Sequence, residues 1–145
     1  MIQLNNKERK KLLEQLNDDY GIENLKLDYL FFKKKDNSIF LITKDFLNLD
    51  KTRFRVDSFG LYFGEIEKNG LRLSISGSQL IGSYATKNCL EINDKENWLN
   101  GQNLECDHNL RTWVIIKNGK DFLGCGYCKN GIVMNFIPKK KQIIV

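Results

Sequence analysis

The most constraining feature of the sequence is a series of short apolar segments after residue 85, separated by turns that carry glycine or asparagine. The segments with strand-like composition are residues 88–92, 113–117, 122–128, 132–137 and 142–145. Several short strands in about 60 residues leave many strand edges to protect. A small barrel or sandwich protects edges within so short a chain, so we expect a compact β-barrel here.

One short helix interrupts this series of strands. Asn93 or Asp94 is suited to cap its start, the helix is expected to run to about Leu99, and Gly101 is suited to end it. Pro138 ends the fourth apolar segment, because proline lacks the N–H that a sheet ladder needs. The pattern therefore predicts one helix placed between the first two strands.

The first 85 residues combine helical and strand patterns. Leu12, Leu13 and Leu16 have helical spacing and predict a helix over residues 5–19, which Gly21 closes. Strand patterns follow at residues 29–32, 39–42, 53–59, 61–66 and 71–75, with short helical turns at 44–49 and 76–81. Ser76 is the expected cap of the second turn. The sequence predicts an α+β chain with a mostly antiparallel N-terminal sheet at 1–85 and a mixed barrel at 86–145.

The composition is that of an ordinary globular protein of 145 residues, with 41% hydrophobic and 28% charged residues. No apolar run approaches the roughly 20 residues that a membrane helix needs, and the N-terminus has no signal-peptide pattern. We therefore expect a cytoplasmic protein and interpret its four cysteines as thiols.

The charge distribution is more informative than the net charge of +5. Between His108 and Val145, seven basic residues stand against the single acidic residue Asp121, an excess of six. Such an excess favours a polyanionic partner, and a phosphate-binding face should be drawn from this segment. A solvated lysine cluster that protects an exposed edge gives the same pattern, so charge alone leaves both interpretations open.

Three segments of the C-terminal half resemble PUA domains, the RNA-binding barrels named after pseudouridine synthases and archaeosine transglycosylases. They are Trp98-Leu-Asn-Gly-Gln-Asn-Leu, the run from Trp113 through Leu-Gly-Cys-Gly-Tyr127, and Asn130-Gly-Ile-Val-Met-Asn-Phe-Ile-Pro-Lys139. The resemblance is closest to the C-terminal domains of Sun-type RNA cytosine methyltransferases and to small ribosome-biogenesis proteins. In the latter a pre-PUA domain precedes the barrel, and residues 59–66 and 71–75 are similar to its strands.

The resemblance implies that RNA binds between the loop after the small helix and the last strand. Gly101 would let the backbone approach a phosphate, asparagine side chains would donate hydrogen bonds, and lysines would supply charge. The predicted RNA-binding residues are Asn100, Gly101, Gln102, Asn103, Arg111, Lys117, Lys120, Lys129, Lys139, Lys140 and Lys141.

The predicted function is non-catalytic RNA binding in ribosome biogenesis or in rRNA or tRNA modification, without a cofactor. The expected partners are rRNA or tRNA, together with a ribosome-assembly factor or an RNA-modifying enzyme that docks on the N-terminal domain. A protein–protein adaptor whose lysines only keep an edge soluble is the first alternative.

A metal-dependent activity at a Cys/His site is the second alternative. Cys125 and Cys128 have the spacing of a zinc knuckle, and Cys106 with His108 would complete a Cys₃His set. Residues three apart on a strand point to opposite faces, however, and 122–128 has a strand pattern. We therefore interpret the two cysteines as core residues and expect no bound metal.

Other candidate chemistry is weak. His108 is the sole histidine and lies in a polar segment, and Glu65 and Glu67 share one face of a predicted strand beside Lys68, where they should be solvated. The aromatic residues alternate within predicted strands, which favours core packing over base stacking; they are Tyr62, Phe63, Trp113, Phe122 and Phe136.

Overall fold

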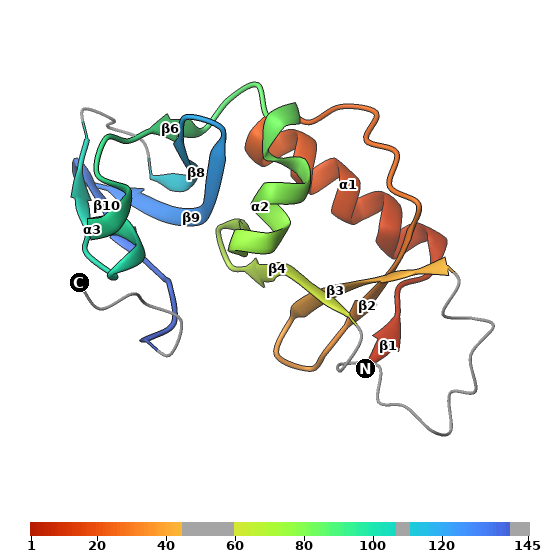
Figure 1. Cartoon of the computed structure of the whole chain (residues 1–145). Coiled ribbons are helices and arrows are strands. Elements are labelled where there is room, and N and C mark those ends of the chain that lie inside the picture. The colour runs from red at the N-terminus through yellow and green to blue at the C-terminus, as the bar shows by residue number, and fades with distance from the viewer. Residues whose placement is uncertain (45–59, 107–110, 140–145) are drawn as a thin grey trace.

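The computed structural model describes residues 1–44, 60–106 and 111–139 and contains two sheets with helices beside them (Figure 1). The predictions for residues 45–59 and 142–145 lie outside the described residues. Among the described helices, none is long and apolar enough to cross a membrane.

The first sheet has the strand order β1-β2-β3-β4-β5 and is antiparallel throughout its described strands. The strands are β1 (Ile2–Gln3), β2 (Tyr29–Lys33), β3 (Ser38–Thr43), β4 (Leu61–Glu67) and β5 (Gly70–Leu73). The predicted hairpins at 29–42 and 61–75 are confirmed by this pairing. Helix α1 (Asn6–Tyr20) packs against the sheet through Leu12, Leu16 and Tyr20.

The ends of α1 have the caps that the sequence predicts. The side chain of Asn5 accepts a hydrogen bond from the backbone N–H of Glu8, and the Glu8 side chain accepts one from the Asn5 N–H. Gly21 ends the helix with φ of 65°, a left-handed conformation that glycine adopts without strain.

The second sheet has the order β6-β8-β9-β10-β7, with β6 parallel to β8 and the other pairs antiparallel. Its strands are β6 (Cys89–Glu91), β7 (Leu104–Glu105), β8 (Thr112–Asn118), β9 (Asp121–Lys129) and β10 (Ile132–Asn135). The sheet curls into a half-barrel, and α3 (Lys95–Leu99) lies beside it. The predicted α+β class, with a mostly antiparallel sheet followed by a mixed, curled one, is confirmed.

Helix α2 (Ile75–Ile81) and the short 3₁₀ helix η3 (Gly82–Tyr84) connect the two sheets. The prediction that Ser76 caps this helix is wrong: the cap is Ser74, whose Oγ accepts from the Gly77 N–H at 2.9 Å. The helix starts two residues earlier than predicted because Ile75 packs into the core of the second sheet.

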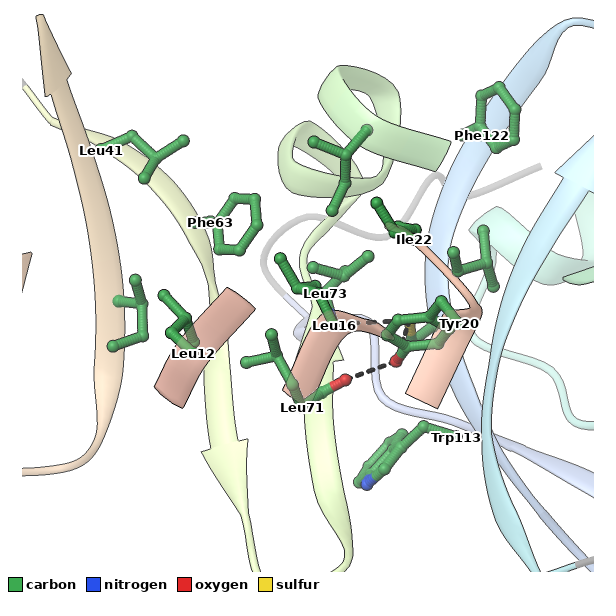
Figure 2. Close-up of a cluster of buried hydrophobic side chains, with 14 of the residues drawn as sticks. Leu12, Leu16, Tyr20, Ile22, Leu41, Phe63, Leu71, Leu73, Trp113 and Phe122 are labelled. Carbon is green, nitrogen blue, oxygen red and sulfur yellow. Dashed lines mark hydrogen bonds between the residues drawn. The ribbon is translucent and has the colours of Figure 1, made fainter. Parts of the chain in front are cut away.

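A continuous core joins the two sheets (Figure 2). It includes Leu16 and Tyr20 of α1, Phe63 of β4, and Trp113 and Phe122 of the second sheet. A second core lies between α3 and the other face of the curled sheet. The strands of the first sheet end at residue 73 and those of the second begin at residue 89. A domain boundary at residue 85 stays a prediction, because the first core extends across it.

Candidate nucleic-acid interface

The loop after α3 is fixed by the way the helix ends. Asp94 caps the start of α3, and Trp98 is fully buried with its Nε1–H donating to the Leu123 carbonyl at 2.9 Å. Because Trp98 anchors the helix on β9, the four residues that follow it toward β7 have a defined position on the surface.

The backbone N–H groups at the start of this loop already donate hydrogen bonds within the protein. Those of Asn100, Gly101 and Gln102 donate to carbonyls within α3 at 2.9, 3.0 and 3.1 Å. Gly101 has φ of 92° and closes the helix. A close approach of its backbone to phosphate stays a prediction. The exposed side chains of Gln102 and Asn103 are the groups of the loop best placed to meet a ligand.

Asn135 at the end of β10 holds the loop in place, a role that the sequence did not predict. Its Nδ2 donates to the carbonyls of Trp98 and Gln102 at 2.7 and 3.1 Å. Its backbone N–H donates to Asn103 Oδ1 at 2.9 Å, and its own Oδ1 accepts from the Ile137 N–H at 2.8 Å. One side chain and its backbone thus join the predicted loop to the predicted closing segment.

The closing segment continues from Asn135 through Ile137 and Pro138 to Lys139. Ile137 is buried in the same core as Trp98, so this segment runs beside α3. Lys139 is exposed. The structure therefore joins the loop 100–103 to the segment that leads to the lysine cluster, whose first residue follows Ile137 by two positions. Lys140 and Lys141 lie outside the described residues.

The other four predicted basic residues lie at two opposite ends of the β8–β9 hairpin. Arg111 and Lys129 are exposed at the end where β8 begins and β9 finishes. Lys117 and Lys120 lie at the turn between the two strands, where Lys117 Nζ is 5.7 Å from the centre of the Phe122 ring. At about 3.3 Å per strand residue, some 20 Å separates the two pairs, so the four residues do not form one patch.

Cys125 belongs to one core and Cys106 and Cys128 to the other, whereas Cys89 is exposed. Cys125 faces the first core, where its Sγ lies 3.2 Å from the Tyr20 hydroxyl oxygen. Cys128 faces the second core and its Sγ lies 3.2 Å from that of Cys106. The prediction that Cys125 and Cys128 point to opposite faces of a strand is confirmed. His108 lies outside the described residues.

Burial affects the ionisation of both core thiols. Desolvation raises the pKa of Cys125 to about 12, although the hydrogen bonds that its Sγ makes with the Tyr20 hydroxyl and the Leu73 N–H act to lower it. Desolvation and the neighbouring Cys106 raise the pKa of Cys128 to about 11. Thiols with raised pKa values stay protonated near neutral pH, and a protonated thiol is a poor nucleophile and a poor metal ligand.

Glu65 and Glu67 do not form a solvated pair, as the sequence suggested, but bind one arginine. Arg72 of β5 donates from Nε to Glu67 Oε1 at 3.1 Å and from Nη2 to Glu65 Oε2. Burial acts to lower the pKa of Arg72, but Tyr62 and the two carboxylates outweigh it and leave the pKa raised. The arginine therefore stays charged, and both carboxylates are held as its counterions.

The expectation that the aromatic residues pack in the core holds for three of the five. Phe63, Trp113 and Phe122 are buried, whereas Tyr62 is half-buried and Phe136 is 39% exposed. Phe136 lies edge-on against Trp113 with ring centres 5.0 Å apart. An exposed aromatic ring thus lies directly after Asn135.

Comparison with known proteins identifies the second half of the chain. Residues 87–140 match the family model described as the methyltransferase RsmF PUA domain. No curated protein matches the chain. The matched residues contain the curled sheet, α3, the loop 100–103 and Lys139. This part of the chain is a PUA domain, an RNA-binding module, and it resembles the C-terminal domain of Sun-type RNA methyltransferases.

Proposed function

We propose that the chain is a non-catalytic RNA-binding protein that acts in ribosome biogenesis or in rRNA or tRNA modification in the cytoplasm. The observation that carries the proposal is that, within the PUA domain, Asn135 fixes an exposed amide-rich loop to the segment that leads, four residues later, to the first lysine of the cluster. The RNA lies along this edge, with Gln102, Asn103 and Lys139 facing it.

The chemistry of this edge suits the backbone of a structured RNA. Amide side chains donate to phosphate and ribose oxygens, and lysines neutralise phosphate charge without reading sequence. Binding through such contacts is strongly dependent on salt and only modestly dependent on sequence. The proposed ligand is therefore an RNA stem or its end rather than a particular base sequence.

The absence of catalysis is part of the proposal. Glu65 and Glu67, the carboxylate pair considered as an acid and base, are both bound to Arg72. Cys125 is separated from Cys106 and Cys128 by the strand that carries it, which argues against a four-ligand zinc site containing all three. We expect the purified protein to contain no stoichiometric zinc and to leave RNA unmodified. About one zinc per chain by metal analysis, or turnover of RNA, would contradict this part.

The first sheet is the proposed docking surface for a ribosome-assembly factor or an RNA-modifying enzyme. The small separate cluster on the side of the sheet away from the main core is not the contact surface, because Leu30, Phe32 and Ile42 are already buried there with Phe40 packed against them. A protein partner on this sheet would leave the α3–β10 edge open to RNA.

The experiment that tests RNA binding replaces Lys139, Lys140 and Lys141 together by alanine. Affinity for an RNA hairpin should fall by about 1–3 kcal/mol at moderate salt if two or three of these lysines bind phosphates. Each phosphate that the variant no longer neutralises should lower the slope of log K against log salt by roughly 0.7–0.9. Fluorescence anisotropy over a series of salt concentrations measures both quantities.

A matched control removes the same charge elsewhere. Lys7, Lys10 and Lys11 are exposed on α1, and their triple alanine variant should bind the hairpin nearly as tightly as the parent protein. Equal decreases in affinity in the two variants would mean non-specific attraction. An unchanged affinity in a folded Lys139–Lys141 variant would exclude this edge and favour the adaptor function.

A further inference from the structure

A cleft of about 280 Å³ lies directly beside the proposed RNA-binding edge. One wall is formed by β4, β5 and the start of α2, and the other by β9 and the segment after β10. Its lining residues include Tyr62, Arg72, Ser76, Gly124, Phe136 and Pro138. The volume lies just below the roughly 300 Å³ at which pockets for drug-sized ligands begin, so the cleft has room for about one flat ring system.

The charges around the cleft do not suit a phosphate. Arg72 provides the one positive charge among the lining residues, but Glu65 and Glu67 bind its guanidinium. One cation held by two carboxylates leaves a net negative site, which repels an anion. A neutral ligand is therefore favoured in the cleft.

The lining does suit a planar aromatic ligand. The guanidinium carbon of Arg72 lies 5.6 Å from the centre of the Phe136 ring, and Phe136 is partly open to solvent. Trp113 supports Phe136 from the core side, with ring centres 5.0 Å apart. Nucleobases stack on aromatic side chains and on arginine planes, so the cleft presents the two kinds of surface that unpaired bases use.

The position of the cleft relates it to RNA rather than to an unrelated ligand. Phe136, Ile137 and Pro138 line it, and they are the three residues between Asn135, which holds the loop 100–103, and the exposed Lys139. Pro138, the residue before Lys139, lines the cleft. A nucleotide whose phosphate contacts Lys139 is therefore near the cleft.

We propose that the cleft binds one unpaired base of the RNA held at the α3–β10 edge. The base stacks on Phe136 beside Arg72, and its phosphate stays outside near Lys139. This proposal rests on the proposed function and adds a preference for RNA with an unpaired nucleotide over a fully paired stem.

The test compares two RNA hairpins that differ in one nucleotide. One stem contains a single bulged 2-aminopurine, and the other lacks that nucleotide. The protein should bind the bulged hairpin about 5- to 100-fold more tightly, the range expected for stacking one base, and should change the fluorescence of 2-aminopurine. Phe136→Leu should reduce the affinity for the bulged hairpin toward that for the paired one, without changing binding of the paired one.

Two further variants separate the base site from a loss of fold. Ser76→Tyr places a bulky ring at an exposed lining position and should have the same effect as Phe136→Leu. Tyr84→Leu removes an aromatic ring that is 59% exposed and does not line the cleft, and it should change neither affinity.

The outcomes distinguish the two proposals. Equal binding of both hairpins, unaffected by Phe136→Leu, overturns the base site and leaves RNA binding intact. Binding of neither hairpin overturns the proposed function itself. A preference for the bulge that persists in folded Phe136→Leu and Ser76→Tyr variants also overturns the site, because the unpaired base must then bind elsewhere.

Discussion

Two regions of the molecule use hydrogen bonds between distant residues, but in different surroundings. At the junction between α1 and the second sheet, the fully buried Tyr20 donates its hydroxyl to the Leu71 carbonyl and lies beside Cys125 (Figure 2). At the α3–β10 edge, Asn135 makes its bonds partly exposed to solvent. The first network is enclosed by apolar side chains, and the second is bordered by exposed amides and Lys139.

This difference indicates what each network does. A buried polar group without a partner costs the free energy of its lost hydration, so the junction acts on stability. Groups at an exposed edge exchange their bonds with water at little cost, so the edge acts by fixing the positions of the side chains that meet a ligand. The following predictions test whether the junction acts on stability alone and the edge mainly on binding.

The largest effect is expected at Tyr20. Tyr20→Ala should lower the free energy of unfolding by about 3–5 kcal/mol, because it removes a fully buried ring from the core that joins the two sheets. Tyr20→Phe should lower it by about 1–3 kcal/mol, because the Leu71 carbonyl is left without its donor. Denaturant unfolding followed by circular dichroism measures both.

Tyr84, which is 59% exposed, provides the matched control, and Tyr84→Ala should change stability by less than about 0.5 kcal/mol. RNA affinity should be unchanged in folded Tyr20→Phe. A weaker affinity in that variant would show that the junction also positions the binding edge, and the distinction between the two regions would fail.

The second prediction concerns stability at alkaline pH. A thiol whose pKa is raised in the folded state stabilises the fold below its unfolded pKa near 9, and this contribution is lost as pH rises from about 9 toward the folded value. The folded pKa of Cys125 is about 12, so the free energy of unfolding should fall by about 1.4 kcal/mol per pH unit above pH 9 through this group alone. Cys128, with a folded pKa of about 11, adds to the fall from the same onset.

Denaturant unfolding at several pH values between 8 and 10 measures this slope. Cys125→Ala should reduce by about one the number of protons released on unfolding, which sets the slope of stability against pH. The packing that the variant loses lowers the free energy of unfolding equally at every pH and leaves the slope unaffected. Tyr20, whose burial raises its pKa well above 10, should begin to contribute only near pH 10. A slope unchanged in Cys125→Ala would mean that this thiol is not protonated in the folded state as its burial implies.

Local signals were sufficient to predict most of the described elements. Asn5 and Gly21 cap α1, and Asn130-Gly131 forms the two-residue turn between β9 and β10, because these residue types adopt the required conformations irrespective of the surrounding fold. The cap of α2 was misplaced because Ser74 and Ser76 are equally suited by type. The choice depends on Ile75 packing into the second core, which a local pattern does not contain.

The candidate site was only partly predictable for the same reason. The loop 100–103 and the lysines were found through a family resemblance, but Asn135 gave no signal, because its partners lie 32 to 37 residues away in the chain. Alternation along the predicted strand 132–137 placed Phe136 on a regular face of that strand. It did not show that this face is left open beside Arg72, since that depends on how the two sheets pack.

The third prediction tests the edge through Asn135. Asn135→Ala removes the side-chain bonds to the Trp98 and Gln102 carbonyls, so the loop must be ordered when RNA binds. Ordering one residue costs about 1–2 kcal/mol, and hairpin affinity should fall by about this amount. Calorimetric titration measures the affinity. Asn69→Ala, a change in the exposed β4–β5 turn, is the control. If Asn135→Ala and Asn69→Ala lower the affinity equally, the hydrogen bonds of Asn135 are not needed to position the loop.

The smallest expected effect distinguishes the two ends of the β8–β9 hairpin. Lys129 pairs with Ile132, which in turn pairs with Glu105, two residues after Asn103. Lys129 therefore lies about two strand spacings, roughly 10 Å, from Glu105, and Arg111 at the start of β8 lies one strand further away.

At the other end, carboxylates surround the lysines of the turn. The side chain of Glu91 accepts from the Gly119 N–H at 2.8 Å, and Asp121 pairs with Lys95. These negative charges should weaken attraction between phosphate and the Lys117 and Lys120 end.

Arg111→Gln with Lys129→Gln should therefore lower the salt slope of hairpin binding by up to about 0.7–0.9 for each phosphate that is no longer neutralised. Lys117→Gln with Lys120→Gln removes the same formal charge and should leave the slope nearly unchanged. Arg111, Lys120 and Lys129 are exposed, so the first double variant should keep the unfolding midpoint of the parent protein. Lys117 is half-buried over the Phe122 ring, so the second should lose a little stability. The opposite order of effects would mean that RNA follows the hairpin toward its turn. In that case the RNA would run toward the first residues of α3, where Lys95 pairs with Asp121.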